Sequence, residues 1–329
     1  MGTTKLHEAY DVALLDLDGV VYIGGTAIPS APPALQRAKA AGMHLAYVTN
    51  NASRTPAAVA GLLRSMEVPA EADDVVTSCQ AAARLLADKL PAGAPVLVIG
   101  STALRLAVRE RGLRPVSTAA SQPQAVVQGY APGLDYQALA EGSLAVRAGA
   151  LFVGTNADST LPGQRGIQPG NGSLLRVIAH ANQVEPVIAG KPELPLHHES
   201  IIRTGARRPL VVGDRLDTDI EAASRAGADS LLVLTGVSGA ADLPAAPPEH
   251  RPTYLAATLD ALLEPYPDVI LEDDGARCRG WTARWQSAAI TLAGDGDPVD
   301  ALRAVCAAAW SREGTAADAA KDALGRLSL

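Results

Sequence analysis

Four groups of polar residues, each beside a short apolar run, carry the side chains in this 329-residue sequence that could do chemistry. They are Asp16-Leu17-Asp18-Gly19, Thr49-Asn50-Asn51, the single residue Lys191, and the stretch from Asp214 to Asp219. Apolar runs of this length, bounded by glycine or polar residues, are typical of buried parallel strands. Because ligands of parallel α/β sheets bind beyond the carboxyl ends of the strands, these positions predict a binding site.

The aspartates of the first and last groups could hold a hard divalent cation. Mg²⁺ prefers oxygen ligands and usually takes one or two carboxylates together with a substrate phosphate. Asp16, Asp18 and Asp214 would supply such a site, and Gly19 would let the chain turn away from the strand. Taken alone, each acidic group has a structural explanation as well, in a turn or in the first turn of a helix.

The two middle groups could bind an anion. Thr49, Asn50 and Asn51 offer a hydroxyl and amide donors, and Lys191 offers a positive charge. Their structural alternatives are equally plain, since threonine and asparagine often cap a helix and a lone lysine is usually a surface residue. It is the order of all four groups, each after a strand, that favours a functional site.

Taken together, these motifs resemble the haloacid dehalogenase-like phosphatase superfamily over about residues 8 to 262. The resemblance implies that Asp16 is a nucleophile forming an aspartyl-phosphate and that Asp18 is the general acid and base. It further implies that Asp16, Asp18 and Asp214 bind Mg²⁺, Asp18 through its main-chain carbonyl. By the same resemblance, Asp219 would hold these ligands in place without binding the ion itself, with Asp217 as the alternative. Thr49, Asn50, Asn51 and Lys191 would bind the phosphoryl group.

The substrate expected from this resemblance is a small phosphorylated metabolite. A small polyol phosphate comes first, with glycerol 3-phosphate ahead of phosphoglycolate, a nucleotide monophosphate or pyridoxal phosphate. A phosphotransferase using the same intermediate is the alternative enzyme. A phospho-aspartate signalling receiver is the non-enzyme alternative, but receivers are compact, whereas 140 positions separate Asn51 from Lys191 here.

The elements that must position these groups alternate between strand and helix. Apolar runs at 12–15, 44–48, 96–99, 125–127, 151–153, 209–212, 230–234, 269–271 and 288–292 predict strands. Helices are predicted at 32–41, at 56–66, where Thr55 is the expected cap before Pro56, and at 298–310. This alternation indicates an α/β fold, a doubly wound parallel-sheet (Rossmann-like) core with helices on both faces.

The long separation before Lys191 exceeds what one crossover needs, so it predicts an inserted domain. We expect a catalytic core at 1–81 and 185–262, an α/β cap at 82–184 and a small α+β module at 266–329. The cap loops at 130–134 and 168–173 are the candidates for reading the leaving group. The last module, which holds all three tryptophans, resembles the truncated acetyltransferase fold of an actinobacterial branch of the superfamily. It lacks a glycine-rich stretch for coenzyme A, so we expect a structural role or a partner surface.

Composition limits the remaining classes of function. The net charge of −7 argues against nucleic acid as the main partner, and no apolar run approaches the length needed to cross a bilayer. The three cysteines lie far apart and form no disulfide framework or metal-spacing motif. We therefore expect a cytoplasmic enzyme without a nucleic-acid or membrane partner. A homodimer could form through the cap or the C-terminal module.

Overall fold

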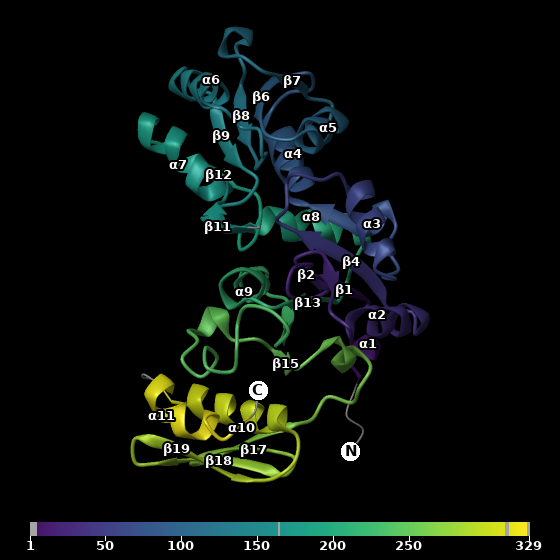
Figure 1. The fold of residues 1–329 in the computed structure, drawn as a ribbon, viewed down its shortest axis with the longest axis vertical. Helices are drawn as coiled ribbons and strands as arrows, with labels where there is room; N and C mark the ends of the chain where they lie inside the picture. Colours follow the sequence, from purple (N-terminus) through teal and green to yellow (C-terminus); the bar gives the residue numbers. More distant parts are fainter. Residues whose placement is uncertain (1–4, 164, 313–315, 328–329) are drawn as a thin grey trace. The chain divides into compact units, whose positions relative to one another are not determined.

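The computed structural model describes residues 5–163, 165–312 and 316–327, which fall into two compact units (Figure 1). The first unit comprises 1–45, 66–69 and 206–329, and the second comprises 46–65 and 70–205. Both contain parallel sheet with helices, so the predicted α/β class is confirmed. These two units are defined by contacts and do not test the expected division into core, cap and C-terminal module. That division stays a prediction.

The first unit is built on parallel strands that pair in the order β15, β14, β13, β1. The strand residues are almost all buried, which explains why their sequences are continuous apolar runs rather than alternating ones. The elements of this part are α1 (Leu6–Ala9), β1 (Val12–Leu15), β2 (Tyr22–Ile23), β3 (Thr26–Ala27), α2 (Ala31–Ala40), β13 (Pro209–Gly213), η3 (Leu216–Ile220), α9 (Glu221–Ala226), β14 (Asp229–Val233), η4 (Pro248–His250), β15 (Tyr254–Ala256) and η5 (Leu259–Leu262).

The C-terminal segment of the same unit forms an antiparallel sheet covered by helices. Its strands pair in the order β16, β17, β18, β19, and α10 and α11 pack against them around an alanine-rich core. The predicted helix from 298 to 310 matches α10, whereas β17, β18 and α11 were not foreseen. The elements are β16 (Val269–Glu272), β17 (Gly275–Cys278), β18 (Trp281–Gln286), β19 (Ala289–Gly294), α10 (Pro298–Trp310) and α11 (Ala316–Leu324).

The second unit has its own parallel sheet, ordered β12, β9, β8, β6, β7, and it also holds the parallel pair β4–β5. Thr55 caps α3, where its hydroxyl accepts from the Ala58 N–H at 3.2 Å, as the Thr-Pro pair predicts. The elements are β4 (His44–Thr49, which begins in the first unit), α3 (Pro56–Ser65), η1 (Ala72–Asp74), β5 (Val75–Thr77), α4 (Ser78–Lys89), β6 (Pro95–Ile99), α5 (Thr102–Glu110), β7 (Arg114–Val116), η2 (Ala119–Ser121), β8 (Ala125–Gln128), α6 (Tyr136–Arg147), β9 (Leu151–Gly154), β10 (Thr160–Gly163), β11 (Gly166–Pro169), α7 (Asn171–Asn182), β12 (Val187–Ile188) and α8 (Leu194–Thr204).

No helix in the described part of the chain is both long and apolar enough to cross a membrane.

A buried ionic cluster joins three helical regions of the second unit. Glu199 of α8 is fully buried, and its carboxylate accepts from Arg84, from Arg111 at 2.6 Å and from Arg203 at 2.5 Å. Each arginine side chain is about a quarter exposed, whereas the carboxylate is not exposed at all. Removing the carboxylate would leave three like charges beside one another without compensation.

We therefore predict that Glu199→Ala lowers the free energy of unfolding by about 3 kcal/mol. The matched control is Glu185→Ala, which removes an exposed glutamate paired with Arg176 at 2.9 Å and should cost less than about 1 kcal/mol. Urea unfolding followed by circular dichroism compares the two variants with the wild type. Equal midpoints for both variants would contradict the assigned role of the buried cluster.

Candidate active site

Three carboxylates converge in the first unit. Asp16, Asp214 and Asp219 each place an oxygen within 4.8 Å of the other two. Asp16 follows β1 and Asp214 follows β13, and these parallel neighbours run in register, with Asp16 N–H donating to the Val212 carbonyl at 2.8 Å. The rule that strand ends carry chemistry therefore explains why residues nearly 200 positions apart meet here.

The main chain of the loop after β14 holds the Asp214 carboxylate in place. Val237 N–H donates to Asp214 Oδ2 at 2.7 Å, and Ser238 N–H donates to the Asp214 carbonyl at 3.0 Å. The Ser238 hydroxyl also accepts from the Leu216 N–H at 3.1 Å, at the start of η3. Since Asp214 and Asp219 are both only 1% exposed, such donors are needed to keep charged carboxylates near one another.

Glycines make room for this carboxylate. A Cβ on Gly236 would lie 1.9 Å from Asp214 Oδ2, and one on Gly19 would lie 2.3 Å from the same oxygen. Gly19 also has a φ of +81°, a backbone conformation that residues with a side chain rarely adopt. A compact set of oxygen donors in a space that a methyl group would fill fits a small, hard cation such as Mg²⁺.

The other two acidic candidates have different surroundings. Asp18 is exposed, in a tight turn where the carbonyl of Gly19 accepts from the Thr235 hydroxyl at 2.6 Å. Asp217 is exposed too, and its carboxylate forms a two-point ion pair with Arg215 that lowers the pKa of Asp217 below its usual value. Of the two candidates for a supporting carboxylate, Asp219 therefore lies with Asp16 and Asp214.

In the second unit, the Asn50 side chain forms two hydrogen bonds with the main chain of Lys191. The Asn50 amide oxygen accepts from the Lys191 N–H at 2.8 Å, and its amide nitrogen donates to the Lys191 carbonyl at 3.1 Å. Lys191 is only 8% exposed, and its ammonium group donates to the Val48 carbonyl at 3.1 Å. The surface-lysine alternative for Lys191 is therefore wrong in this structure, and a buried ammonium at a strand end suits an anion.

Thr49 and Asn51 also make local contacts. The Thr49 hydroxyl accepts from the Asn51 N–H at 3.1 Å, and the Asn51 amide oxygen accepts from the Ser53 N–H at 2.8 Å. These are turn contacts rather than the helix caps of the structural alternative, since Thr55 caps α3, and the side chain of Asn51 organises the loop. The buried Thr49 and the Asn50–Lys191 pair lie together within the second unit.

Several residues that support these groups were not identified as site residues from the sequence. Asn156 and Ser78 both donate to the Asn50 carbonyl at 2.8 Å, and Gly190 leaves space for the Asn50 side chain. In the first unit, Thr235, Val237 and Ser238 play the same supporting part. They also follow a strand, β14, so the strand-end rule applied to every strand would have found this second set.

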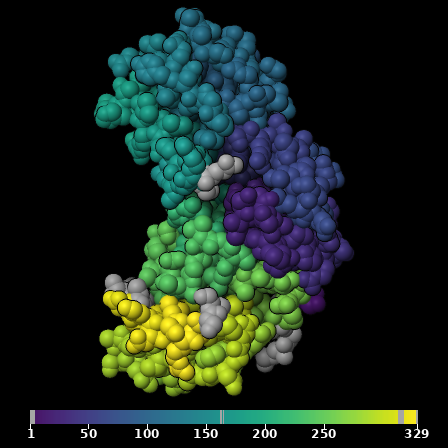
Figure 2. All heavy atoms as spheres, in the orientation of Figure 1, coloured from purple at the N-terminus to yellow at the C-terminus, as the bar shows by residue number. Residues whose placement is uncertain are grey.

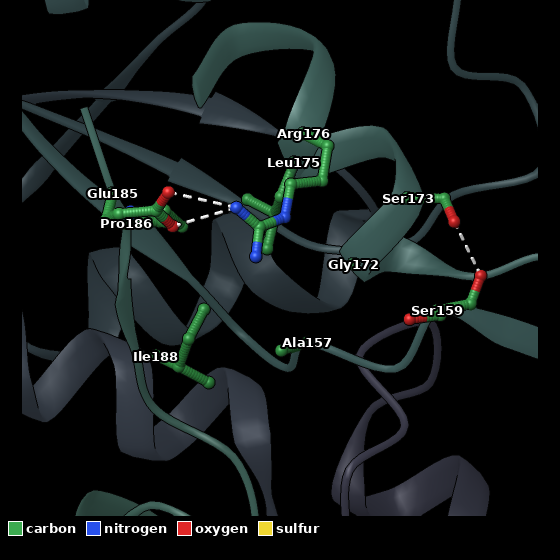
Figure 3. Close-up of a pocket in the computed structure, with 9 residues that line it drawn as sticks. All are labelled: Ala157, Ser159, Gly172, Ser173, Leu175, Arg176, Glu185, Pro186 and Ile188. Carbon is green, nitrogen blue, oxygen red and sulfur yellow. Dashed lines mark hydrogen bonds and ion pairs between the residues drawn. The ribbon is translucent and has the colours of Figure 1, made fainter. Parts of the chain in front are cut away.

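The second unit also contains a small cavity of about 160 Å³ beside α7 (Figure 3). Gly172 and Ser173, from the segment expected to read the leaving group, lie on its wall. On the same wall Arg176 pairs with Glu185 at 2.9 and 3.1 Å, and the Ser173 hydroxyl donates to the Ser159 carbonyl at 2.7 Å. None of the sequence-predicted catalytic, phosphoryl-binding or metal-binding residues lines this cavity.

Family models match three parts of the chain. The model described as haloacid dehalogenase-like hydrolase matches residues 13–114, and a second one for hydrolases of this type matches residues 188–262. A model described as a GCN5-related N-acetyltransferase-like domain matches residues 278–329.

Relatives match over most of the chain. The D-glycerol 3-phosphate phosphatase of Mycobacterium tuberculosis is 42% identical over 95% of this chain and 89% of its own length. The 5'-nucleotidase YutF of Bacillus subtilis is 39% identical over 71% of this chain and 90% of its own length. The crystal structure of glycerol phosphate phosphatase Rv1692 from M. tuberculosis, in complex with magnesium, superposes with a TM-score of 0.89 at 40% identity, covering 100% of this chain and 99% of that one.

The packing around Asp214 leads to a test with a matched pair of substitutions. We predict that Gly236→Ala weakens Mg²⁺ binding by about 10–100-fold, because the new methyl group must displace the Asp214 carboxylate. Gly239→Ala is the control, since its Cβ would meet nothing closer than Asp242 at 3.9 Å. Calorimetric titration of Mg²⁺ into both variants measures the difference. The same affinity in both would mean that Asp214 does not hold the ion.

Proposed function

The chain belongs to the haloacid dehalogenase-like hydrolases, and from that premise we propose that it is a Mg²⁺-dependent phosphatase that hydrolyses glycerol 3-phosphate through an aspartyl-phosphate on Asp16. The observation that carries the proposal is the convergence of Asp16, Asp214 and Asp219 in a space fit for a small cation. The metal-bound structure of the 40%-identical relative supports the identity of the ion.

In the proposed reaction, a carboxylate oxygen of Asp16 attacks phosphorus and the bond from phosphorus to the leaving alkoxide breaks. Asp18 gives its proton to that alkoxide, then takes one from the water that hydrolyses the acyl phosphate and releases inorganic phosphate. The exposed position of Asp18 suits a group that exchanges protons with substrate and water. Bound Mg²⁺ supplies positive charge that offsets the charge on the phosphoryl oxygens.

We assign phosphoryl binding to Thr49, Asn50, Asn51 and Lys191. The demand in phosphoryl transfer is electrostatic, so fixed cations and donors contribute most. The two-point contact of Asn50 with the main chain of Lys191 suggests that Asn50 acts mainly by fixing the lysine. The burial of Lys191 strengthens the electrostatic attraction between its ammonium group and a bound anion, because less water screens the charge.

Glycerol 3-phosphate is the proposed substrate because the similarity to the mycobacterial phosphatase extends through the C-terminal segment. The nucleotidase and an acid sugar phosphatase of Staphylococcus aureus match only 71–73% of the chain. Phosphoglycolate, nucleotide monophosphates and pyridoxal phosphate remain the alternatives. The cytoplasmic location, the homodimer, the domain boundaries and the specificity role of 130–134 and 168–173 stay predictions.

A panel of phosphorylated metabolites tests the proposed substrate. With Mg²⁺ present, we expect kcat/KM for glycerol 3-phosphate to exceed that for nucleotide monophosphates, phosphoglycolate and pyridoxal phosphate. Release of inorganic phosphate is the measurement, with Asp16→Asn as the inactive control because its amide is a poor nucleophile. Higher kcat/KM for a nucleotide would reject the substrate, and full activity of Asp16→Asn would reject the mechanism.

A second prediction concerns the buried lysine. Lys191→Ala should lower kcat/KM for p-nitrophenyl phosphate by about 10²-fold or more, as expected when a preorganised charge is removed. Lys89→Ala, at the exposed end of α4 in the same unit, is the control and should leave the rate within about twofold. Wild-type kinetics in Lys191→Ala would show that the lysine has only a structural role.

A further inference from the structure

The loop that holds Asp214 continues into a core shared with the C-terminal segment. After the contacts of Thr235, Val237 and Ser238, the chain runs on to Leu243, which is fully buried. Leu243 belongs to a hydrophobic cluster that also contains Leu302 of α10. The stretch from 235 to 243, called here the clasp loop, therefore touches the acidic group at one end and α10 at the other.

The turn that carries Asp219 rests on the same core. Leu216 and Ile220, the first and last residues of η3, are in the cluster with Val299, Leu302 and Cys306 of α10. All five side chains are nearly or fully buried. Because Asp219 lies between Leu216 and Ile220, the position of its carboxylate depends on how this turn packs against α10.

A hydrogen bond from α10 fixes the clasp loop directly. The Trp310 indole N–H donates to the Leu243 carbonyl at 3.0 Å, and that carbonyl also accepts from the Ala246 N–H at 3.0 Å. The guanidinium of Arg251 covers the Trp310 ring at 5.7 Å. Trp310 is the last residue of α10, so the helix end and the loop are joined at one point.

A second contact sets the position of α10 along the sheet. Arg303, only 9% exposed, donates to the Leu255 carbonyl of β15 through Nε at 2.9 Å and Nη2 at 2.6 Å. The same guanidinium pairs with Asp300 at 2.5 Å and lies 4.6 Å from the centre of the Tyr266 ring. Figure 1 draws α10 along the side of the first unit that carries β15, and in Figure 2 the yellow C-terminal surface is continuous with the green surface before it.

We propose that the C-terminal segment fixes the geometry of the acidic site. Trp310 and Leu302 are positioning residues in this proposal. They act on Asp214 through the clasp loop and on Asp219 through η3. The inference rests on the proposed function in so far as Asp214 is taken to bind Mg²⁺. It gives the segment a role that requires no cofactor and no catalytic group of its own. A change where α10 meets the clasp loop or η3 then reaches the metal site through packed side chains and main-chain hydrogen bonds.

The experiment compares two tryptophan substitutions in the full chain. Trp310→Phe keeps an aromatic ring but removes the donor to the Leu243 carbonyl. Trp285→Phe is the matched control, because its indole N–H donates to the Ala308 carbonyl at 2.7 Å, within the C-terminal segment and away from the clasp loop. Each variant loses one hydrogen bond of the same kind.

We expect Trp310→Phe to raise the dissociation constant for Mg²⁺ by about 3–10-fold in calorimetric titration, the effect of one lost hydrogen bond. Trp285→Phe should stay within about twofold of the wild type. Saturating Mg²⁺ should restore kcat for p-nitrophenyl phosphate in Trp310→Phe, with an unchanged KM. Leu302→Val removes one methylene group from the shared core and should also weaken Mg²⁺ binding. This variant replaces Trp310→Phe in the test if Trp310→Phe does not fold.

Hydrogen exchange of the clasp loop separates this inference from the proposed function. Exchange over 235–243 should be faster in Trp310→Phe than in Trp285→Phe, whether or not the protein hydrolyses phosphate esters. Equal exchange and equal Mg²⁺ affinity in both variants would overturn the inference. If the wild type neither binds Mg²⁺ nor releases phosphate, the proposed function is rejected. Faster exchange over 235–243 in Trp310→Phe than in Trp285→Phe would still leave the coupling of α10 to the loop standing.

Discussion

The acidic site depends on keeping three carboxylates within 4.8 Å of one another while two of them are almost fully buried. Burial and like charge both oppose this arrangement, so something must offset them. The main-chain N–H of Val237 does so for the Asp214 carboxylate, and the absence of a Cβ at Gly19 and Gly236 lets the chain approach it. The same closeness of the oxygens suits a divalent cation, which prefers oxygen ligands.

The second unit solves a different problem, which is to hold a positive charge at the end of a strand without exposing it. Lys191 is buried, and Asn50 binds its main chain on both sides. Asn156 and Ser78 in turn hold Asn50 through its carbonyl. Each polar group in this chain of contacts is a donor or acceptor for the next, so a loss at any point would loosen the lysine.

In our proposal, the C-terminal segment supports the acidic site without contributing a catalytic residue. Its outer sheet has its own alanine-rich core with α10 and α11, yet α10 also packs against η3 and the loop beyond β14. The arginine of α10 that binds the Leu255 carbonyl is almost fully buried, as expected for a permanent contact rather than a movable one. The acetyltransferase-like match to this region is thus compatible with a supporting role.

The sequence by itself determined the α/β class, the strands that are followed by candidate site residues, and the order of the four motifs. These features are local: apolar runs indicate buried strands, and polar residues at their ends indicate a site. Asp16 and Asp214 were found by that rule, and the observed pairing of β1 with β13 brings them together. The helix from 298 to 310 was equally clear, because its proline start and apolar spacing are local too.

Only the tertiary structure decided which of several chemically equivalent residues takes part. Asp217 and Asp219 are both acidic and two positions apart, but Arg215 pairs with the first, while the turn of η3 buries the second beside Asp214. Lys191 could equally have been a surface residue, and its contact with Asn50 joins positions 141 apart. The role of Trp310 depends on a carbonyl 67 positions away. Contacts across such distances depend on how whole elements pack, which no local pattern of residues encodes.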